Sequence, residues 1–320
     1  MLLISTPGRL KSLPEIPEEL IAASFIEPVQ HVPMNVAERA RVLAGNSAAD
    51  CIVAIGGGSA IGVAKAVALE IPLPIIAVPT TYGGSEMTSI WGITRDGKKE
   101  TGRDPRVRPL TTIYDPDLTL DMPRSMTASS GMNALAHCVE ALYAPDGNTL
   151  TSGAAMQGLL LLTDALPRLS GSPRDPAARA TALEGAWLAG FALGTVSMGI
   201  QHKLAHTLGG SFGLPHSETH AVLLPYTAAY NRDPAQVAMV GIADFLDADD
   251  APTAILELSQ SIGAPLSLKE IGFREADIPA AARLAVEKQY SNPRPVTESE
   301  VSALLAAAYA GDTGYVVGSG

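Results

Sequence analysis

The chain has few cysteines, few aromatic residues and few charged residues for its length. Its 320 residues include 2 cysteines, 5% aromatic residues and 17% charged residues. Cys51 and Cys138 lie far apart and form no CxxC pair, which is typical of buried thiols in a reducing compartment. Lys and Arg number 22 against 33 Asp and Glu, a net charge of −11 that argues against nucleic-acid binding. A small acidic substrate stays compatible, since a basic pocket can lie on an acidic surface.

Long apolar runs and a secretory leader are also missing. The opening residues show no basic segment followed by a long apolar run, so they do not resemble a signal peptide. The apolar run at 159–162 is soon ended by Asp164 and Pro167, far short of the length that spans a bilayer. We therefore expect a cytoplasmic protein without membrane contact. A hydrophobic content of 47% indicates a compact globular fold.

Short apolar runs alternate with helical patterns over the first 120 or so residues. Helices are expected at Asn35–Leu43 and Ala60–Glu70. The expected buried strands are Leu2–Ser5, Cys51–Ile55, Ile75–Val78 and Thr111–Tyr114. Strands separated by helices predict a parallel, Rossmann-like α/β sheet that binds ligands at the carboxyl ends of its strands.

The character of the sequence changes near Met122–Arg124. Beyond this point strand signals nearly vanish and alanine- and leucine-rich helical patterns follow, at 126–143, 151–166, 176–195, 199–208, 219–230, 234–246 and 251–261. We predict an α/β dinucleotide-binding domain over 1–124 and an all-helical catalytic domain over 125–320. A ligand cleft is expected between them.

Two glycine-rich loops indicate a nucleotide site. Gly56-Gly57-Gly58-Ser59 follows one strand and precedes a helix, where exposed amides and the helix dipole favour a phosphate. This is not the GxGxxG fingerprint, and a tight turn without a ligand is the alternative. The segment 79–86, PTTYGGSE, follows the next strand at the same sheet edge. Two such loops side by side suit a pyrophosphate and a ribose.

The helical half contains a constellation of histidines. Asn133 and His137 are four residues apart on one predicted helix, and His202 and His206 on another, so each pair shares a face. His216 follows a loop rich in glycine, and His220 comes after it. Imidazoles that converge from two helices and a loop are typical of a metal or acid/base site, with surface or core histidines as the alternative. A divalent cation prefers a carboxylate ligand, and position 133 is asparagine, so any metal would be held loosely or not at all.

Five segments resemble the iron-containing alcohol dehydrogenase superfamily and, within it, are similar to the maleylacetate reductase branch. They are GGGSAIGVAKAVAL (56–69), PIIAVPTTYGGSEMTSIWGIT (74–94), TGRDPRVRPLTTIYDPDLT (101–119), SGMNALAHCVEALYAP (130–145) and HKLAHTLGGSFGLPHSETHAVLLP (202–225). The resemblance implies a dehydroquinate synthase-like architecture and a homodimer. Family members also begin with a strand hairpin and part of a helix, so by analogy we expect that roughly 30–40 such residues of the family are missing before Leu2.

The resemblance also implies residue roles. The family's metal ligands fall on Asn133, His137, His202 and His216, and the departure at Asn133 puts dependence on iron or zinc in doubt. An NAD-specific relative carries aspartate where this chain has Thr6, so we expect both NADH and NADPH to be accepted. The cofactor-binding residues implied are Thr6, Gly56, Gly57, Gly58, Ser59, Thr80, Thr81, Gly84, Ser85, Lys99 and Leu118.

The reaction implied by the resemblance is the reduction of the enone double bond of 2-maleylacetate to 3-oxoadipate, in the degradation of aromatic compounds. We expect His137, His202 and His216 to surround the oxygen that becomes an enolate, and His206 to donate the proton. Arg103, Lys203 and Arg106 are candidates to bind the two substrate carboxylates. The alternatives are a metal-dependent alcohol or polyol dehydrogenase, and an inactive remnant that only binds a dinucleotide.

Overall fold

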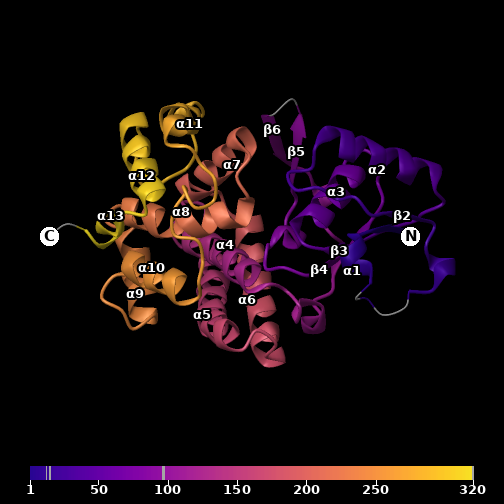
Figure 1. The fold of residues 1–320 in the computed structure, drawn as a ribbon, viewed down its shortest axis with the longest axis horizontal. Coiled ribbons are helices and arrows are strands. Elements are labelled where there is room, and N and C mark those ends of the chain that lie inside the picture. The colour runs from indigo at the N-terminus through magenta and orange to yellow at the C-terminus, as the bar shows by residue number, and fades with distance from the viewer. Residues whose placement is uncertain (12, 14–15, 96–97, 319–320) are drawn as a thin grey trace. The chain divides into compact units, whose positions relative to one another are not determined.

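The computed structural model describes residues 1–320 except 12, 14–15, 96–97 and 319–320. It consists of two compact units, Met1–Met122 and Pro123–Gly320 (Figure 1). The first unit contains a parallel sheet with helices, and the second is helical. The predicted fold class, an α/β unit followed by an all-helical unit, is confirmed.

The first unit is built on a five-stranded sheet of order β2-β1-β3-β4-β7, in which all neighbours are parallel. Its strands are β1 (Leu2–Ile4), β2 (Ala23–Phe25), β3 (Ile52–Gly56), β4 (Ile75–Pro79) and β7 (Thr111–Thr112). The sequence analysis did not predict β2, nor the separate hairpin of β5 (Ile90–Arg95) with β6 (Lys98–Arg103). The residues of β6, KKETGR, are polar and do not alternate with apolar residues, which is the pattern by which a strand is recognised.

Alternating side chains of this sheet pack on its two faces. Leu2 and Ile4 face α2 (Met34–Asn46) and α3 (Gly58–Ala68), whereas Leu3 packs in a small cluster on the opposite face. The chain order reverses between β1 and β3, since β2 follows β1 on one side and β3 lies on the other. Such a reversal opens a ligand crevice at the carboxyl ends of the strands. α1 (Pro7–Leu10) follows β1 at this end.

The second unit has α4 (Arg124–Leu142) at its centre, packed against α5, α6 and α8 (Figure 1). Nearly every residue from Thr127 to Ala141 is buried, which is typical of a helix surrounded by other helices. Small residues allow close packing: a Cβ at Gly158 of α5 would lie 3.2 Å from the backbone oxygen of Gly185 in α6. The remaining helices are α5 (Thr149–Gly171), α6 (Pro176–Thr195), α7 (Ile200–Phe212), α8 (His216–Tyr230), α9 (Gln236–Phe245), α10 (Ala251–Ser261), α11 (Ile278–Val286), α12 (Glu298–Ala310) and α13 (Thr313–Val317).

Several helix boundaries differ from those expected, among them the end of α5 and the start of α8. α5 continues past Pro167 to Gly171, because the buried Leu166 and Leu169 pack into the core on either side of the proline. α8 begins at His216 rather than at Thr219. Within the described part of the chain no single helix is long and apolar enough to cross a membrane, and one bent pair, α6 with α7, passes by length and composition alone.

Candidate active site

Three helices of the second unit bring five imidazole rings together. His137 comes from α4, His202 and His206 from α7, and His216 and His220 from α8. Ring centroids are 4.9 Å apart for His137 and His202, 4.7 Å for His202 and His220, and 4.7 Å for His216 and His220. His206 lies 6.1 Å from His202 and 5.9 Å from His216. We call these five residues the imidazole cluster.

The cluster has a buried part and a more open part. His137, His202 and His220 are buried, whereas His206 and His216 are half-buried and their rings stack at 22°. His216 was expected in a loop, and it is instead the first residue of α8. This follows from Pro215, which suits the position just before a helix. His216 and His220 therefore share one helix face.

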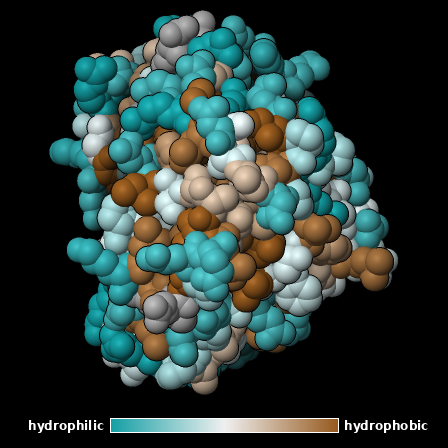
Figure 2. Space-filling view, turned by 90° about the vertical axis from the view of Figure 1, so that its right-hand side faces the viewer, coloured by the Kyte–Doolittle hydropathy of each residue, from teal (hydrophilic) through white to brown (hydrophobic). Residues whose placement is uncertain are grey.

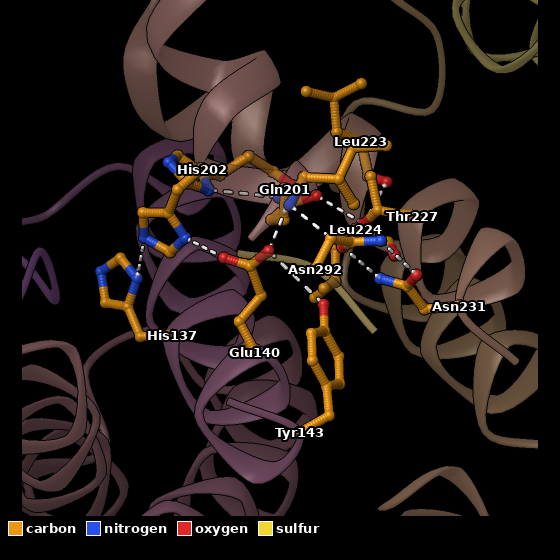
Figure 3. Close-up of polar contacts among 12 residues, drawn as sticks. His137, Glu140, Tyr143, Gln201, His202, Leu223, Leu224, Thr227, Asn231 and Asn292 are labelled. Carbon is orange, nitrogen blue, oxygen red and sulfur yellow. Dashed lines mark hydrogen bonds and ion pairs between the residues drawn. The ribbon is translucent and has the colours of Figure 1, made fainter. Parts of the chain in front are cut away.

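A chain of hydrogen bonds links the buried rings to a carboxylate that the sequence analysis missed. Glu140 of α4 is 1% exposed, and its Oε2 contacts His202 Nδ1. The other ring nitrogen of His202, Nε2, lies 2.9 Å from His137 Nδ1. Figure 3 shows this chain, with His137 and Glu140 on α4 and His202 facing both. Glu140 Oε1 also accepts hydrogen bonds from the Gln201 backbone N–H at 2.9 Å and the Tyr143 hydroxyl at 3.4 Å.

The positions of the protons follow from this chain. A carboxylate only accepts hydrogen bonds, so His202 donates to Glu140 from Nδ1. A neutral His202 then has a lone pair on Nε2, which accepts the Nδ1–H of His137. His137 is left with its lone pair on Nε2. Glu140, His202 and His137 thus form one continuous chain of hydrogen bonds, which is the arrangement of a general acid/base relay.

The side chain of Gln201 holds the ring of His220 in place through hydrogen bonds. The Gln201 side-chain nitrogen lies 2.9 Å from the His220 backbone oxygen and 3.1 Å from His220 Nδ1. Its oxygen lies 2.7 Å from the Thr227 hydroxyl (Figure 3). Burial, and then the neighbouring His216 and other imidazoles, lower the pKa of His220 well below its ordinary value. His220 is therefore neutral.

Asn133, one turn before His137 on α4, is 2% exposed. Its Oδ1 has no hydrogen-bond partner within the described residues. Gly199, at the start of α7, lies close to the carboxylate: a Cβ there would be 3.0 Å from Glu140 Oε1, so a side chain would have to displace it by a few tenths of an ångström.

The two glycine-rich loops of the first unit lie side by side. The Thr80 backbone N–H donates to the Gly56 oxygen at 3.1 Å, and a Cβ at Gly57 would lie 3.0 Å from the Thr81 side chain. No side chain caps α3, which begins at Gly58 with Ser59 next, so its first amides can bind an anion.

Lys65 holds the second glycine-rich loop (79–86) in place through hydrogen bonds. Its ammonium donates to the backbone oxygens of Ser85, Thr88 and Ile90 at 2.6, 2.9 and 2.8 Å. Gly84, just before Ser85, has a φ of 73°, a left-handed conformation that favours glycine. The loop that carries Gly84 and Ser85 is therefore rigidly held at the carboxyl end of β4.

Arg9 links Thr6 and Leu118 at this end of the sheet. The Thr6 side chain caps α1 by accepting the Arg9 backbone N–H, and the Arg9 guanidinium donates to the Leu118 oxygen at 2.7 Å. All of the predicted cofactor residues except Lys99 thus lie in or beside loops that follow β1, β3, β4 and β7. Lys99 lies on β6 opposite Thr94, and burial lowers its pKa. Asp96 and Gly97, which precede it, lie outside the described residues.

The predicted substrate-binding cations are divided between the units. Lys203 is in the second unit, half-buried, with its ammonium 5.8 Å from the centre of the Tyr290 ring, and burial lowers its pKa. Arg103 ends β6 in the first unit. The exposed Arg106 is bound to Asp104 through both carboxylate oxygens, which leaves it less available for a substrate.

A parallel nucleotide-type sheet, followed by a helical unit that gathers acid/base groups, defines a dinucleotide-dependent oxidoreductase. Residues 2–116 match the family described as iron-containing alcohol dehydrogenase, and residues 127–309 match the C-terminal part of the same family. The chain belongs to the iron-containing alcohol dehydrogenase family.

Similar proteins include several maleylacetate reductases. The chain is 50% identical over 287 residues to a maleylacetate reductase of Burkholderia cepacia, covering 90% of this chain and 82% of that protein. The crystal structure of maleylacetate reductase from a Rhizobium species has a TM-score of 0.89 at 43% identity, covering 97% of this chain and 89% of that one. An iron-containing alcohol dehydrogenase from Corynebacterium glutamicum has a TM-score of 0.91 at 40% identity, covering 99% and 89%. A sulfoacetaldehyde reductase from Bifidobacterium kashiwanohense, solved in complex with NAD+, shares the fold with a TM-score of 0.85 at 24% identity, covering 96% of this chain and 90% of that one.

The residues at the position of the family's metal do not fit a metal centre. The nitrogens of His137 and His202 that face each other are 2.9 Å apart and share a proton, so these two atoms are not free for a cation. Asn133 replaces an anionic ligand with a neutral one. Across the described ranges no three His, Cys, Asp or Glu side chains are arranged to hold a metal ion.

Two residues of this site, Glu140 and Gln201, were not predicted from the sequence, and His220 was named there only as part of the histidine constellation, without a role. A signal existed for Glu140, which is three residues after His137 and seven after Asn133 and so shares their helix face. Gln201 and His220 meet only through the packing of α7 against α8, and no spacing within one helix predicts that contact.

Proposed function

We propose that this protein reduces the enone double bond of 2-maleylacetate with NADH or NADPH and yields 3-oxoadipate. The identity of 43–50% to maleylacetate reductases over nearly the whole chain supports this proposal. The single structural observation that carries it is the metal-independent chain of hydrogen bonds from Glu140 through His202 to His137. It supplies proton transfer and hydrogen bonding without a Lewis acid.

The chemistry divides into a hydride step and a proton step. A nicotinamide bound by the loops of the first unit would supply a hydride to the alkene carbon β to the ketone, and the electron pair of the double bond would move onto the ketone oxygen as an enolate. The enolate then collapses as a proton is added to the carbon α to the ketone. Hydrogen-bond donors directed at the enolate oxygen stabilise the first transition state, and a nearby acid serves the second.

The imidazole cluster would provide both functions. His206 and His216 form its half-buried side, where a substrate can reach the rings. We assign proton donation to His206, with His137 and His202 as the proton reserve that Glu140 stabilises. Lys203 lies one residue from His202, and its ammonium can pair with a substrate carboxylate. Arg103 stays a candidate for the second carboxylate.

The cofactor site is assigned to the loops of the first unit. The amides of Gly57, Gly58 and Ser59 at the start of α3 would bind the pyrophosphate, beside Thr80 and Thr81. Thr6 presents no carboxylate to repel a 2′-phosphate, and the guanidinium of Arg9 lies in the same short helix. Acceptance of both NADH and NADPH is therefore proposed.

The test supplies maleylacetate with NADH and with NADPH, each with and without a chelator, and follows nicotinamide absorbance. We expect oxidation of both cofactors at rates that the chelator does not change. Activity on alcohols that the chelator abolishes would instead identify a metal-dependent alcohol dehydrogenase. Saturable NADH binding by fluorescence with no turnover of any enone diacid or alcohol would identify an inactive dinucleotide-binding protein.

We also propose that the protein is a cytoplasmic homodimer. Cys51 and Cys138 are both free thiols, which suits a reducing compartment.

β2 is an edge strand, and large apolar side chains near it are exposed, namely Leu20, Ile26 and Val29. Figure 2 shows apolar residues gathered in the middle of one face of the molecule. Light scattering after gel filtration tests the proposal, with a monomer mass as the contrary result.

A further inference from the structure

His220 carries a buried hydrogen-bond donor that nothing in the described structure uses. The residue is 0% exposed, and its Nε2 has no hydrogen-bond partner within the described residues. Buried polar atoms without partners are rare in folded proteins, and they often lie where a ligand supplies the missing contact. This atom lies within the imidazole cluster, where a ligand of the candidate site could supply that contact.

The proton of His220 is placed on Nε2 by Gln201. The backbone oxygen of His220 can only accept a hydrogen bond, so the amide nitrogen of Gln201, not its oxygen, must face it at 2.9 Å. The same nitrogen lies 3.1 Å from His220 Nδ1, and an amide nitrogen only donates. Nδ1 is therefore an acceptor, and a neutral His220 holds its single proton on Nε2.

Gln201 is itself held in place. Its side-chain oxygen lies 2.7 Å from the Thr227 hydroxyl, and its backbone N–H donates to Glu140 at 2.9 Å. Both Gln201 and Thr227 are fully buried. The amide cannot rotate without losing three hydrogen bonds, so the tautomer of His220 is set by the packing of α7 against α8.

The ring of His220 lies among three other members of the imidazole cluster. Its centroid is 4.7 Å from those of His202 and His216 and 5.8 Å from that of His137. His216 is half-buried, so the ring of His220, 4.7 Å from that of His216, lies next to the half-buried side of the imidazole cluster.

We propose that His220 donates its Nε2–H to the ketone oxygen of the substrate as that oxygen becomes an enolate, and that Gln201 positions this donor. The inference rests on the function proposed above. A neutral imidazole can polarise a carbonyl in this way without giving up its proton. His220 would then be a catalytic residue that the histidine spacing in the sequence did not single out, and Gln201 a positioning residue.

Two substitutions of His220 test which of its two ring nitrogens acts as the hydrogen-bond donor. The side-chain nitrogen of glutamine can reach the place of Nε2, whereas that of asparagine reaches only the place of Nδ1. His220→Asn should lower kcat on maleylacetate by about 10²–10³, the usual loss for one oxyanion donor, with the affinity for NADH unchanged. His220→Gln should be at least about tenfold faster than His220→Asn. Equal rates for the two variants, or a wild-type rate for His220→Asn, would overturn the proposal.

The role of Gln201 is tested by a readout that does not depend on turnover. The chain has 6 histidines, so ¹⁵N-histidine labelling gives a nitrogen spectrum simple enough to assign by single substitutions. The wild-type protein should show His220 protonated on Nε2. Gln201→Met keeps the volume but removes the donor, and it should add the Nδ1-protonated form and lower kcat without changing NADH affinity.

Failure of the role of His220 and failure of the proposed function would give different results. A wild-type His220 protonated on Nδ1 contradicts the inference even in a protein that reduces maleylacetate. A protein that shows the Nε2 tautomer but never turns over maleylacetate contradicts the proposed function, and with it the role of His220 in that reaction. Melting temperatures of the four proteins, measured alongside, identify any variant whose loss of rate comes from unfolding.

Discussion

Glu140→Gln is the most informative single change, because it preserves shape while it reverses a chain of hydrogen bonds. The new side chain can still accept the Gln201 backbone N–H through one oxygen. Its NH₂ group, however, now faces His202 Nδ1, which must become an acceptor. His202 then carries its proton on Nε2 and directs it at His137 Nδ1, so His137 loses its lone pair on Nε2.

The size of the effect follows from the hydrogen bonds involved. A hydrogen bond to a charged group contributes about 1.5–3 kcal/mol, and 1.36 kcal/mol corresponds to tenfold in rate. We therefore expect kcat/KM on maleylacetate to fall by about 10- to 150-fold, with little change in NADH affinity. The assay follows nicotinamide absorbance with NADH saturating and maleylacetate varied. Fluorescence titration gives the affinity for the cofactor.

Two further variants make the result interpretable. Glu140→Ala leaves both His202 and the Gln201 N–H without their acceptor, so it should destabilise the fold by at least about 2 kcal/mol in urea unfolding. Glu184→Gln makes the same chemical change on the exposed side of α6 and should alter neither rate nor stability. A Glu140→Gln enzyme that retains wild-type kcat/KM would refute the proton relay.

The remaining predictions concern the other parts of the molecule. Gly57→Val should abolish NADH binding in a fluorescence titration, because its side chain would collide with Thr81, while Gly45→Ala on α2 should bind normally. His206→Ala should reduce kcat at least tenfold with an unchanged Kd for NADH, and a full rate would remove it as proton donor. Burial lowers the pKa of Lys65 to about 7, below the unfolded value of about 10.4, so the unfolded chain binds more protons between these values. The free energy of unfolding should therefore rise from pH 7 to pH 9 in urea titrations, and this increase should be smaller in Lys65→Met. An equal slope in that variant would show that another group causes it.

Local patterns in the sequence were sufficient for much of the fold. The apolar runs of β1, β3 and β4 were recognisable because buried parallel strands consist almost wholly of apolar residues. The helices of the second unit were recognisable by their periodicity. β2 and the β5–β6 hairpin were not, because β2 buries only one side chain and β6 is polar, so neither shows an apolar run, and both form only when partner strands are present.

The candidate site likewise contains residues that the sequence could place and contacts that only the packing of helices decides. Spacing along single helices determined that Asn133 would share a face with His137, and His202 with His206, since residues four apart in a helix are neighbours. Only the packing of α4, α7 and α8 decided that Glu140 contacts His202 and that Gln201 selects the proton position of His220. A hydrogen bond between two helices depends on their relative rotation and depth. Those quantities result from the packing of every side chain between the helices, which no periodicity within one segment encodes.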